Sequence, residues 1–264
     1  MQANIFCIKW GTAFGPEYVN RLYSGVRRNM DRPVRFFCMT EHGAGLHPEI
    51  EVLPLPVEPF AGPMAAALAV ANRQGAMRKV SLFRPGLVPD LEGPVLGFDL
   101  DVVITGPLGP LHDLAPGTVA MRHDWVEKRK GRPTGHGSVF RFDPAQHGFL
   151  YEDLARAPYA EVERARGSEQ RYTSHKAMDR GVFTYLPDPW VVSFKYDCNP
   201  FPRNWIHPPR LPAEARVVCF HGHPKMTEAL EGWNGSLIRH SKPCGWLREH
   251  WIDRTRADLG PDWA

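Results

Sequence analysis

The part of the chain that most constrains its fold is an apolar run over residues 95–106, with the sequence VLGFDLDVVITG. Near-continuous apolar runs of this kind are typical of strands that are buried on both faces. Asp99 and Asp101 interrupt the run, and a buried charge is costly unless it is paired or binds a metal. Alternate strand residues share a face, so we expect a strand over 95–104 that presents both carboxylates on one side. Such oxygen ligands bind divalent cations. The alternative is that one aspartate caps the next turn and the other merely ends the strand.

Length and composition are those of one ordinary α/β domain. The chain has 264 residues, of which 43% are hydrophobic, and this is enough to bury a full core. The formal charge of +3 is small. The densest basic run, residues 127–132, is typical of a solvated loop, so nothing in the sequence predicts a nucleic acid partner.

Cysteine usage and hydropathy bear on the compartment. The chain has five scattered cysteines and no C-x-x-C pair: Cys7, Cys38, Cys198, Cys219 and Cys244. This pattern favours reduced thiols in a cytoplasm over a disulfide framework or a zinc knuckle. The start of the chain lacks the regions of a signal peptide, and no stretch approaches the roughly 20 apolar residues that span a bilayer. We therefore expect a soluble cytoplasmic protein without a transmembrane segment, and leave peripheral membrane contact open.

The beginning of the chain predicts a βαβ unit. Short apolar strands over 4–8 and 34–39 flank a helix over 16–29, whose apolar residues recur at helical spacing. Such a unit implies a parallel sheet. Farther along, the pattern predicts helices over 64–80, 149–155, 168–178 and 246–259, and strands over 118–121, 138–142, 182–186 and 216–220.

A second group of candidate residues follows the last predicted strand, where residues 219–226 read CFHGHPKM. Gly222 permits close approach of the backbone to a ligand, and Lys225 offers a point charge for phosphate. His221 or His223 could add a nitrogen ligand to the aspartate pair. His221 is favoured, because it shares a face with Cys219 if the strand continues. Carboxylates plus imidazole suit Mn²⁺ somewhat better than Mg²⁺.

Together the two groups resemble glycosyltransferase family 8, whose members are metal-dependent enzymes of the GT-A fold. That family carries an apolar strand with an Asp-x-Asp motif, matched here by FDLDVV at 98–103. It also carries a late His-aromatic-x-Gly-x-x-Lys-Pro loop, matched in part by 219–226. Weaker matches in the same order are IFC at 5–7, RKVSLF at 78–83, SVFRF at 138–142 and GSEQ at 167–170.

The sequence departs from the family pattern at several positions. Cys219 stands where the family has its metal-binding histidine, and Met226 replaces the proline that follows the lysine. Lys9 stands where an acidic residue often reads the base, and Glu169 replaces the usual aspartate. The resemblance is therefore to a divergent member.

The resemblance implies a single GT-A domain over residues 1–264 with a mostly parallel central sheet. Residues 1–104 would form the nucleotide-binding part, and residues 105–264 the acceptor part with the C-terminal helices. The implied activity is metal-dependent transfer of a sugar from a nucleotide-diphospho-sugar donor, with Mn²⁺ or Mg²⁺. The acceptor would be a glycan, a lipid-linked molecule or a small molecule.

The resemblance also assigns site residues. The implied metal ligands are Asp99, Asp101 and His221, with Cys219 and His223 as alternatives to the histidine. Lys225 would meet the leaving diphosphate, while Glu169 and Gln170, or His123 and Asp124, would orient the sugar or acceptor. Glu169 has a second interpretation, because an acidic residue at a helix start also complements the helix dipole. Donor contacts are expected at Cys7, Lys9, Lys79, Asp99, Leu100, Gly222 and Lys225.

Two other classes of function fit part of the pattern. A haloacid-dehalogenase-like phosphatase also has an Asp-x-Asp strand, in which Asp99 would be the nucleophile and Asp101 the acid/base. Its motif usually opens the fold and needs a downstream acidic pair, whereas this sequence contains no Gly-Asp or Asp-Asp dipeptide. A non-catalytic nucleotide or glycan binder on the same fold is the third class.

Overall fold

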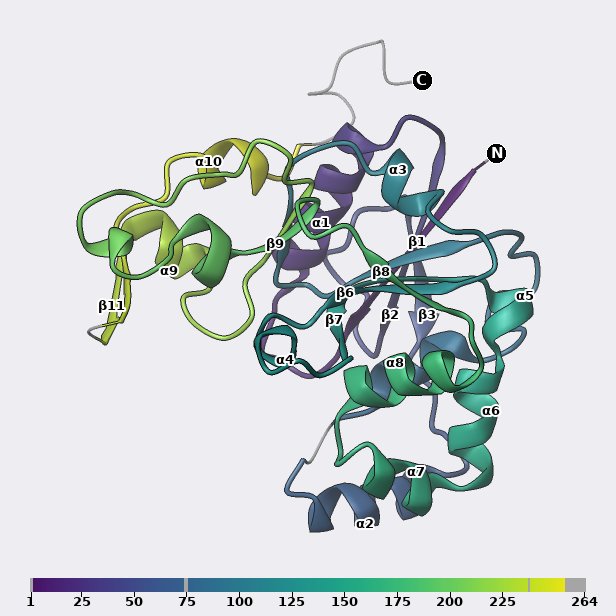
Figure 1. Ribbon diagram of the computed structural model, residues 1–264. Helices are drawn as coiled ribbons and strands as arrows, with labels where there is room; N and C mark the ends of the chain where they lie inside the picture. The colour runs from purple at the N-terminus through teal and green to yellow at the C-terminus, as the bar shows by residue number, and fades with distance from the viewer. Residues whose placement is uncertain (1, 74–75, 237, 255–264) are drawn as a thin grey trace.

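Two β-sheets form the frame of the molecule (Figure 1). The computed structural model describes residues 2–73, 76–236 and 238–254, and within these the larger sheet has seven strands and the smaller has three. From edge to edge, the larger sheet consists of β3 (Ile50–Pro54), β2 (Val34–Thr40), β1 (Ala3–Lys9), β4 (Val95–Phe98), β7 (Gly135–Phe142), β6 (Val119–His123) and β8 (Phe183–Leu186). The smaller sheet consists of β5 (Val102–Ile104), β10 (Val217–Cys219) and β9 (Val191–Ser193).

Strand direction confirms the prediction of an α/β fold with a mostly parallel central sheet. The neighbours β3, β2, β1 and β4 all run parallel, as do β6 and β8. Among the described strands of this sheet, only β7 is antiparallel to its neighbours, which are β4 and β6. Parallel strands end at one edge, so the carboxyl ends of β1 and β4 lie next to each other, which is where open α/β sheets bind ligands.

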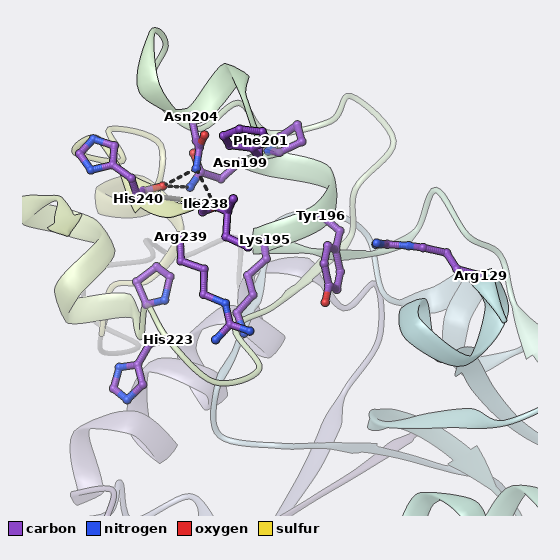
Figure 2. A pocket seen from close by; sticks show the side chains of 12 residues that line it. Arg129, Lys195, Tyr196, Asn199, Phe201, Asn204, His223, Ile238, Arg239 and His240 are labelled. Atoms are coloured by element: carbon purple, nitrogen blue, oxygen red, sulfur yellow. Dashed lines mark hydrogen bonds between the residues drawn. The ribbon is translucent and has the colours of Figure 1, made fainter. Parts of the chain in front are cut away.

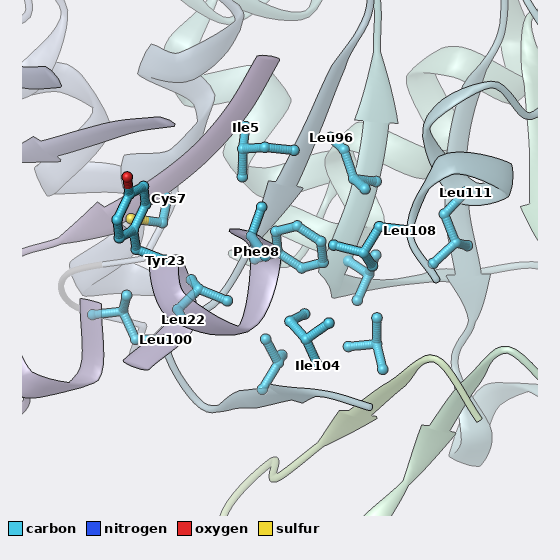
Figure 3. Close-up of a cluster of buried hydrophobic side chains, with 14 of the residues drawn as sticks. Ile5, Cys7, Leu22, Tyr23, Leu96, Phe98, Leu100, Ile104, Leu108 and Leu111 are labelled. Carbon is cyan, nitrogen blue, oxygen red and sulfur yellow. The ribbon is translucent and has the colours of Figure 1, made fainter. Parts of the chain in front are cut away.

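The helices cover the two faces of the larger sheet. Alternation along β1 sends Ile5 and Cys7 into one hydrophobic cluster and Phe6 and Ile8 into another. The first cluster lies between the larger sheet, the smaller sheet and helix α1 (Pro16–Asn29) (Figure 3). The second is covered by α2 (Ala61–Val70), the 3₁₀ helix η1 (Arg78–Phe83), α6 (Phe149–Arg156), α7 (Pro158–Arg164) and α8 (Glu169–Asp179).

The remaining elements are short. A third cluster packs the outer face of the smaller sheet against α9 (Met226–Glu231) and α10 (Leu247–His250), beside a hairpin of β11 (Trp233–Ser236) and β12 (Arg239–Ser241). No helix in the described part of the chain is both long and apolar enough to cross a bilayer. The other helices are α3 (Gly109–His112), α4 (Trp125–Arg129), α5 (Pro144–His147), the π-helical turn η2 (Phe194–Cys198) and η3 (Arg203–Trp205).

Three of the predicted elements differ from the structure. The prediction of one helix over 64–80 is wrong: α2 ends at Val70, and Asn72 and Met77 have φ angles of 52° and 70°, which no α-helix contains. The prediction of one strand over 95–104 is also wrong, because β4 and β5 belong to different sheets. Of the helix predicted over 246–259, the structure shows α10, and residues 255–259 lie outside the described residues.

Helix α1 is tied to a segment far away in the sequence. The hydroxyl Oγ of Ser24 accepts from the backbone N–H of Arg254 at 2.9 Å, and the Arg28 guanidinium donates to the carbonyl of His250 at 2.7 Å. The Arg21 guanidinium lies 4.0 Å from the ring centre of Trp251. Residues 250–254 thus close over the outer side of α1.

Candidate active site

The two aspartates lie at the point where the chain passes from one sheet to the other. The N–H of Asp99 donates to the carbonyl of Ser138 on β7 at 3.0 Å, and the carbonyl of Asp101 accepts from the N–H of Phe220 at 2.8 Å. Leu100 between them is only 4% exposed and belongs to the first cluster. Leu100 points into the core, whereas Asp99 and Asp101 both line the cavity described next. They stand in a turn and not on the single strand from which the sequence predicted a shared face.

A cavity of about 660 Å³ opens at this turn. Its volume lies within the range of small-molecule sites, roughly 300–1,000 Å³. It sits beside the carboxyl ends of β1 and β4. Its lining combines the loop after β1, the start of η1, the aspartate turn and the start of α8: Ile8, Trp10, Gly11, Thr12, Ala13, Phe14, Ala76, Met77, Arg78, Lys79, Asp99, Leu100, Asp101 and Glu169.

Lys79 neutralises one side of the site. Its Nζ donates to Oδ1 of Asp99 at 2.8 Å and to the carbonyl of Gly137 at 2.9 Å, and lies 3.4 Å from Oε1 of Glu169. Its backbone N–H donates to the other oxygen of Glu169 at 2.8 Å. Burial lowers the pKa of Lys79, but the two carboxylates outweigh this effect and raise it overall, so the ammonium stays charged.

Lys225 neutralises the other side. Its Nζ donates to Oδ2 of Asp101 at 2.6 Å. Its backbone N–H donates to Glu228 at 2.6 Å, and Glu228 also pairs with Nδ1 of His223 at 2.8 Å. Glu228 thus fixes two residues of the loop before α9. Burial and the charge of Asp99 raise the pKa of Asp101, while Lys225 opposes the rise.

The donor set for a metal is only partly assembled. Asp99 and Asp101 supply the oxygen ligands that Mn²⁺ and Mg²⁺ prefer. Nε2 of His221 lies 2.8 Å from the hydroxyl of Ser193, and its ring stacks on Trp125 with centroids 5.1 Å apart. Among the described residues, no three His, Cys, Asp or Glu side chains come together as a metal site. The structure therefore brings two of the three predicted ligands to one place and leaves His221 apart.

Neither alternative to His221 joins the aspartates. Burial raises the pKa of the Cys219 thiol well above its ordinary value, and the charges of Asp101 and Asp99 add to the effect. His223 is engaged with Glu228. Burial, and then His136, lowers the pKa of His221 to about 3, which leaves its imidazole neutral at physiological pH.

The start of α8 contributes a second polar group. The side chain of Gln170 donates to Oδ2 of Asp124 at 3.1 Å and accepts from the N–H of Gly137 at 3.2 Å. Asp124 in turn caps α4. Since the carbonyl of Gly137 contacts Lys79, the residues Glu169, Gln170 and Asp124 form one hydrogen-bonded group with Lys79. His123 stacks on Tyr185 and does not line the cavity.

The first strand contributes less to the site than predicted, and the loop after it contributes more. Cys7 is fully buried in the first cluster and Lys9 is 6% exposed, and neither lines the cavity. Sequence reasoning missed Trp10, Phe14 and Arg78, whose guanidinium lies 4.7 Å from the ring centre of Trp10. Their position directly after, or beside, the carboxyl end of a parallel strand was a usable signal.

Comparison with solved structures identifies the fold. No protein-family model and no curated protein sequence matches the chain. A structure of an active-site mutant of LgtC superposes with a TM-score of 0.57 at 13% identity, over 84% of this chain and 89% of that one. The galactosyltransferase LgtC with donor and acceptor sugar analogs gives 0.53 at 15% identity, over 84% of this chain and 88% of that one. The glycosyltransferase GlyE of Streptococcus pneumoniae TIGR4 gives 0.55 at 12% identity, over 90% of this chain and 58% of GlyE. This chain therefore has the fold of the GT-A glycosyltransferases.

Proposed function

We propose that this protein is a glycosyltransferase that moves a sugar from a nucleotide-diphospho-sugar to an acceptor hydroxyl with the help of a divalent metal. The observation that carries the proposal is the pairing of two aspartates that line one cavity with two lysines. Asp99 pairs with Lys79, which also lines the cavity, and Asp101 pairs with Lys225, which lies outside the lining. Carboxylates suit a hard cation, and lysines suit phosphate oxygens. A metal-bound diphosphate needs both kinds of group at once.

The nucleotide belongs on the side of the loop after β1. Trp10 is 44% exposed at the cavity and offers a flat face on which a base can stack. All lining residues other than Glu169 come from the first 104 residues, which supports residues 1–104 as the nucleotide-binding part. The lining contains Lys79 and Arg78 as cations for the phosphates.

Donor binding and metal binding are coupled in this proposal. Each aspartate now has a lysine partner, so a cation gains access to the carboxylates when the lysines move to the phosphates of the donor. Mn²⁺ or Mg²⁺ held by Asp99 and Asp101 would act as a Lewis acid that neutralises the leaving diphosphate. Nε2 of His221 is free to join as a third ligand only if it leaves Ser193.

The residues of the chain then divide the reaction between them. The bond from the anomeric carbon to the diphosphate breaks as the bond to the acceptor oxygen forms. The leaving diphosphate keeps the electron pair of the broken bond, and one of its oxygens takes the proton of the acceptor hydroxyl. Lys225 and the backbone near Gly222 stabilise the charge that develops on the diphosphate. Gly222 has a φ of 78°, which favours glycine where the backbone approaches a ligand. Glu169 and Gln170 orient the transferred sugar.

Hydrolysis of the donor tests this function without knowledge of the acceptor. The purified protein is incubated with a panel of nucleotide-sugars, and free sugar and nucleoside diphosphate are measured. We expect slow hydrolysis that EDTA abolishes and Mn²⁺ restores. Lys225→Ala should lower kcat about 100- to 1,000-fold, more than it raises KM, because the lost charge acts on the transition state. Lys128→Ala, at an exposed ion pair on α4, is the matched control.

The same assay separates the remaining alternatives. Phosphate release from small phosphomonoesters, dependent on Asp99 and without cleavage of any nucleotide-sugar, would overturn the transferase in favour of a phosphatase. The GT-A fold argues against that outcome. Tight binding of a nucleotide-sugar without either activity would instead favour a non-catalytic binder.

A further inference from the structure

A second cavity, of about 500 Å³, lies between η2, the following loop and the hairpin of β11 and β12 (Figure 2). It adjoins the first site through the loop before α9, because His223 and Pro224 line it and the next residue, Lys225, bonds to Asp101. None of its described lining residues is acidic. These residues are Arg129, Lys195, Tyr196, Asn199, Pro200, Phe201, Asn204, His223, Pro224, Ile238, Arg239 and His240.

The cations of this cavity lack counter-charges. In the described part of the chain, no carboxylate forms an ion pair with Lys195, Arg239 or Arg129, and the Arg129 guanidinium lies over the ring of Tyr196 at 4.1 Å. Burial lowers the pKa of Lys195, and the charges of Arg239 and Lys225 lower it further, with Asp101 opposing them. Like charges crowded into a partly buried space favour an anionic ligand.

Two buried amides add a second, independent feature. Asn199 and Asn204 are 7% and 1% exposed and both line the cavity. Their side-chain nitrogens donate to the carbonyl of His240 at 2.8 and 2.9 Å (Figure 2). The oxygen Oδ1 of each is buried and has no hydrogen-bond partner among the described residues. An unpaired buried acceptor is costly, and a ligand hydroxyl would satisfy it.

We propose that this cavity binds the acceptor, and that the acceptor is a sugar bearing an anionic group, either a phosphate or a carboxylate. The proposal rests on the transferase function proposed above. Lys195 and Arg239 would bind the anionic group. The Oδ1 atoms of Asn199 and Asn204 are closed off from the cavity in this structure, so they would accept from sugar hydroxyls after a small shift of the two side chains. Phe201, which is 53% exposed, and Tyr196 provide the aromatic faces that a sugar ring packs against.

Calorimetry without any donor tests the cavity alone. Trehalose 6-phosphate is compared with trehalose, and cellobiouronic acid with cellobiose, so that the two arms separate phosphate from carboxylate. We expect at least one anionic sugar to bind about tenfold or more tightly than its neutral counterpart, as hydrogen bonds to charged groups allow. Arg239→Gln and Lys195→Gln should each remove this preference. Arg156→Gln, at an exposed position on α6, should retain it.

The outcomes distinguish this proposal from the function on which it rests. Equal affinities within both sugar pairs would overturn it, as would a preference that survives both substitutions. Displacement of the anionic sugar by a nucleoside diphosphate alone would also overturn it, since the cavity would then belong to the donor. A preference that follows Lys195 and Arg239 in a protein that cleaves no nucleotide-sugar would support the anionic-sugar site while the transferase function fails.

Discussion

At the scale of single residues, Lys79 is the central charge of the candidate active site. Its single ammonium group forms ion pairs with both Asp99 and Glu169, which come from different parts of the fold. The exposed fractions of the Lys79, Asp99 and Glu169 side chains are 18%, 28% and 16%, so solvent only partly screens the carboxylates. Removal of the lysine would leave two poorly hydrated negative charges close together.

Lys79→Ala should therefore destabilise the protein by about 3 kcal/mol, as loss of one partner from a largely buried pair does. Lys128→Ala breaks an exposed pair with Asp188 and should change stability by less than about 1 kcal/mol. Urea denaturation of both variants measures the difference. The difference in unfolding free energy between wild type and Lys79→Ala should shrink as the pH falls. In the variant, the unpaired carboxylates bind protons more tightly in the folded state than in the unfolded state. A difference in unfolding free energy that does not change with pH would contradict this explanation.

At the scale of elements, the main feature is the change of sheet between β4 and β5. The apolar pattern over 95–104 predicted burial correctly, but periodicity carries no information about which sheet a residue joins. The aspartates could be found from the sequence because a charged residue within an apolar run is costly to bury unless it has a partner or a function. The cavity with Lys195 and Arg239 could not, because η2 and β12 are brought together only by the tertiary fold.

The prediction of a helix over 64–80 was wrong for a different reason. Residues 61–70 are rich in alanine and form α2 without a clear amphipathic pattern. The sequence did carry a stop signal that the prediction passed over, since Asn72 follows the helix with a φ of 52° and Gly75 comes soon after it. Farther along, the chain begins a separate 3₁₀ helix, η1, and the N–H of Lys79 in its first turn donates to Glu169. In contrast, α1 has a clear apolar stripe, and its predicted bounds of 16–29 agree with the structure.

Gly97 sets the spacing between β4 and β7. A Cβ at this position would overlap the ring of Phe140, which covers the glycine. Gly97→Ala should cost about 1–3 kcal/mol through overpacking, and the Phe140→Leu change should relieve part of this cost. Gly62→Ala on α2, where no atom lies within 4 Å, should be neutral or slightly stabilising. Additive effects of the Gly97 and Phe140 changes in a double-mutant cycle would disprove the contact.

At the scale of the whole molecule, two half-buried histidines lie near the junction of the two sheets. The rings of His136 and His221 lie 5.2 Å apart, and both contact Trp125. Burial lowers the pKa of His136 to about 4, although Asp124 and Asp99 oppose the shift, and that of His221 to about 3. Both histidines are neutral in the folded protein at pH 5, whereas in the unfolded chain they are largely protonated below about pH 6.5.

The free energy of unfolding should therefore fall as the pH drops from about 6.5 toward 4, because the unfolded state binds more protons. Each histidine contributes up to about 1.4 kcal/mol per pH unit. His136→Asn should reduce this slope by up to that amount, which urea titrations at several pH values would measure. His207→Asn, at an exposed position, is the control. An unchanged slope in His136→Asn would show that this ring does not resist protonation.

The bond between Ser24 and Arg254 has a consequence for how the protein is made. The two residues are 230 positions apart, and the contact of Arg28 with His250 spans 222. At about 5–20 residues per second, a ribosome needs roughly 10–45 seconds to synthesise the intervening chain. During that time the outer side of α1 remains uncovered. This surface of the nascent protein is therefore accessible to a chaperone until residues 250–254 pack against it.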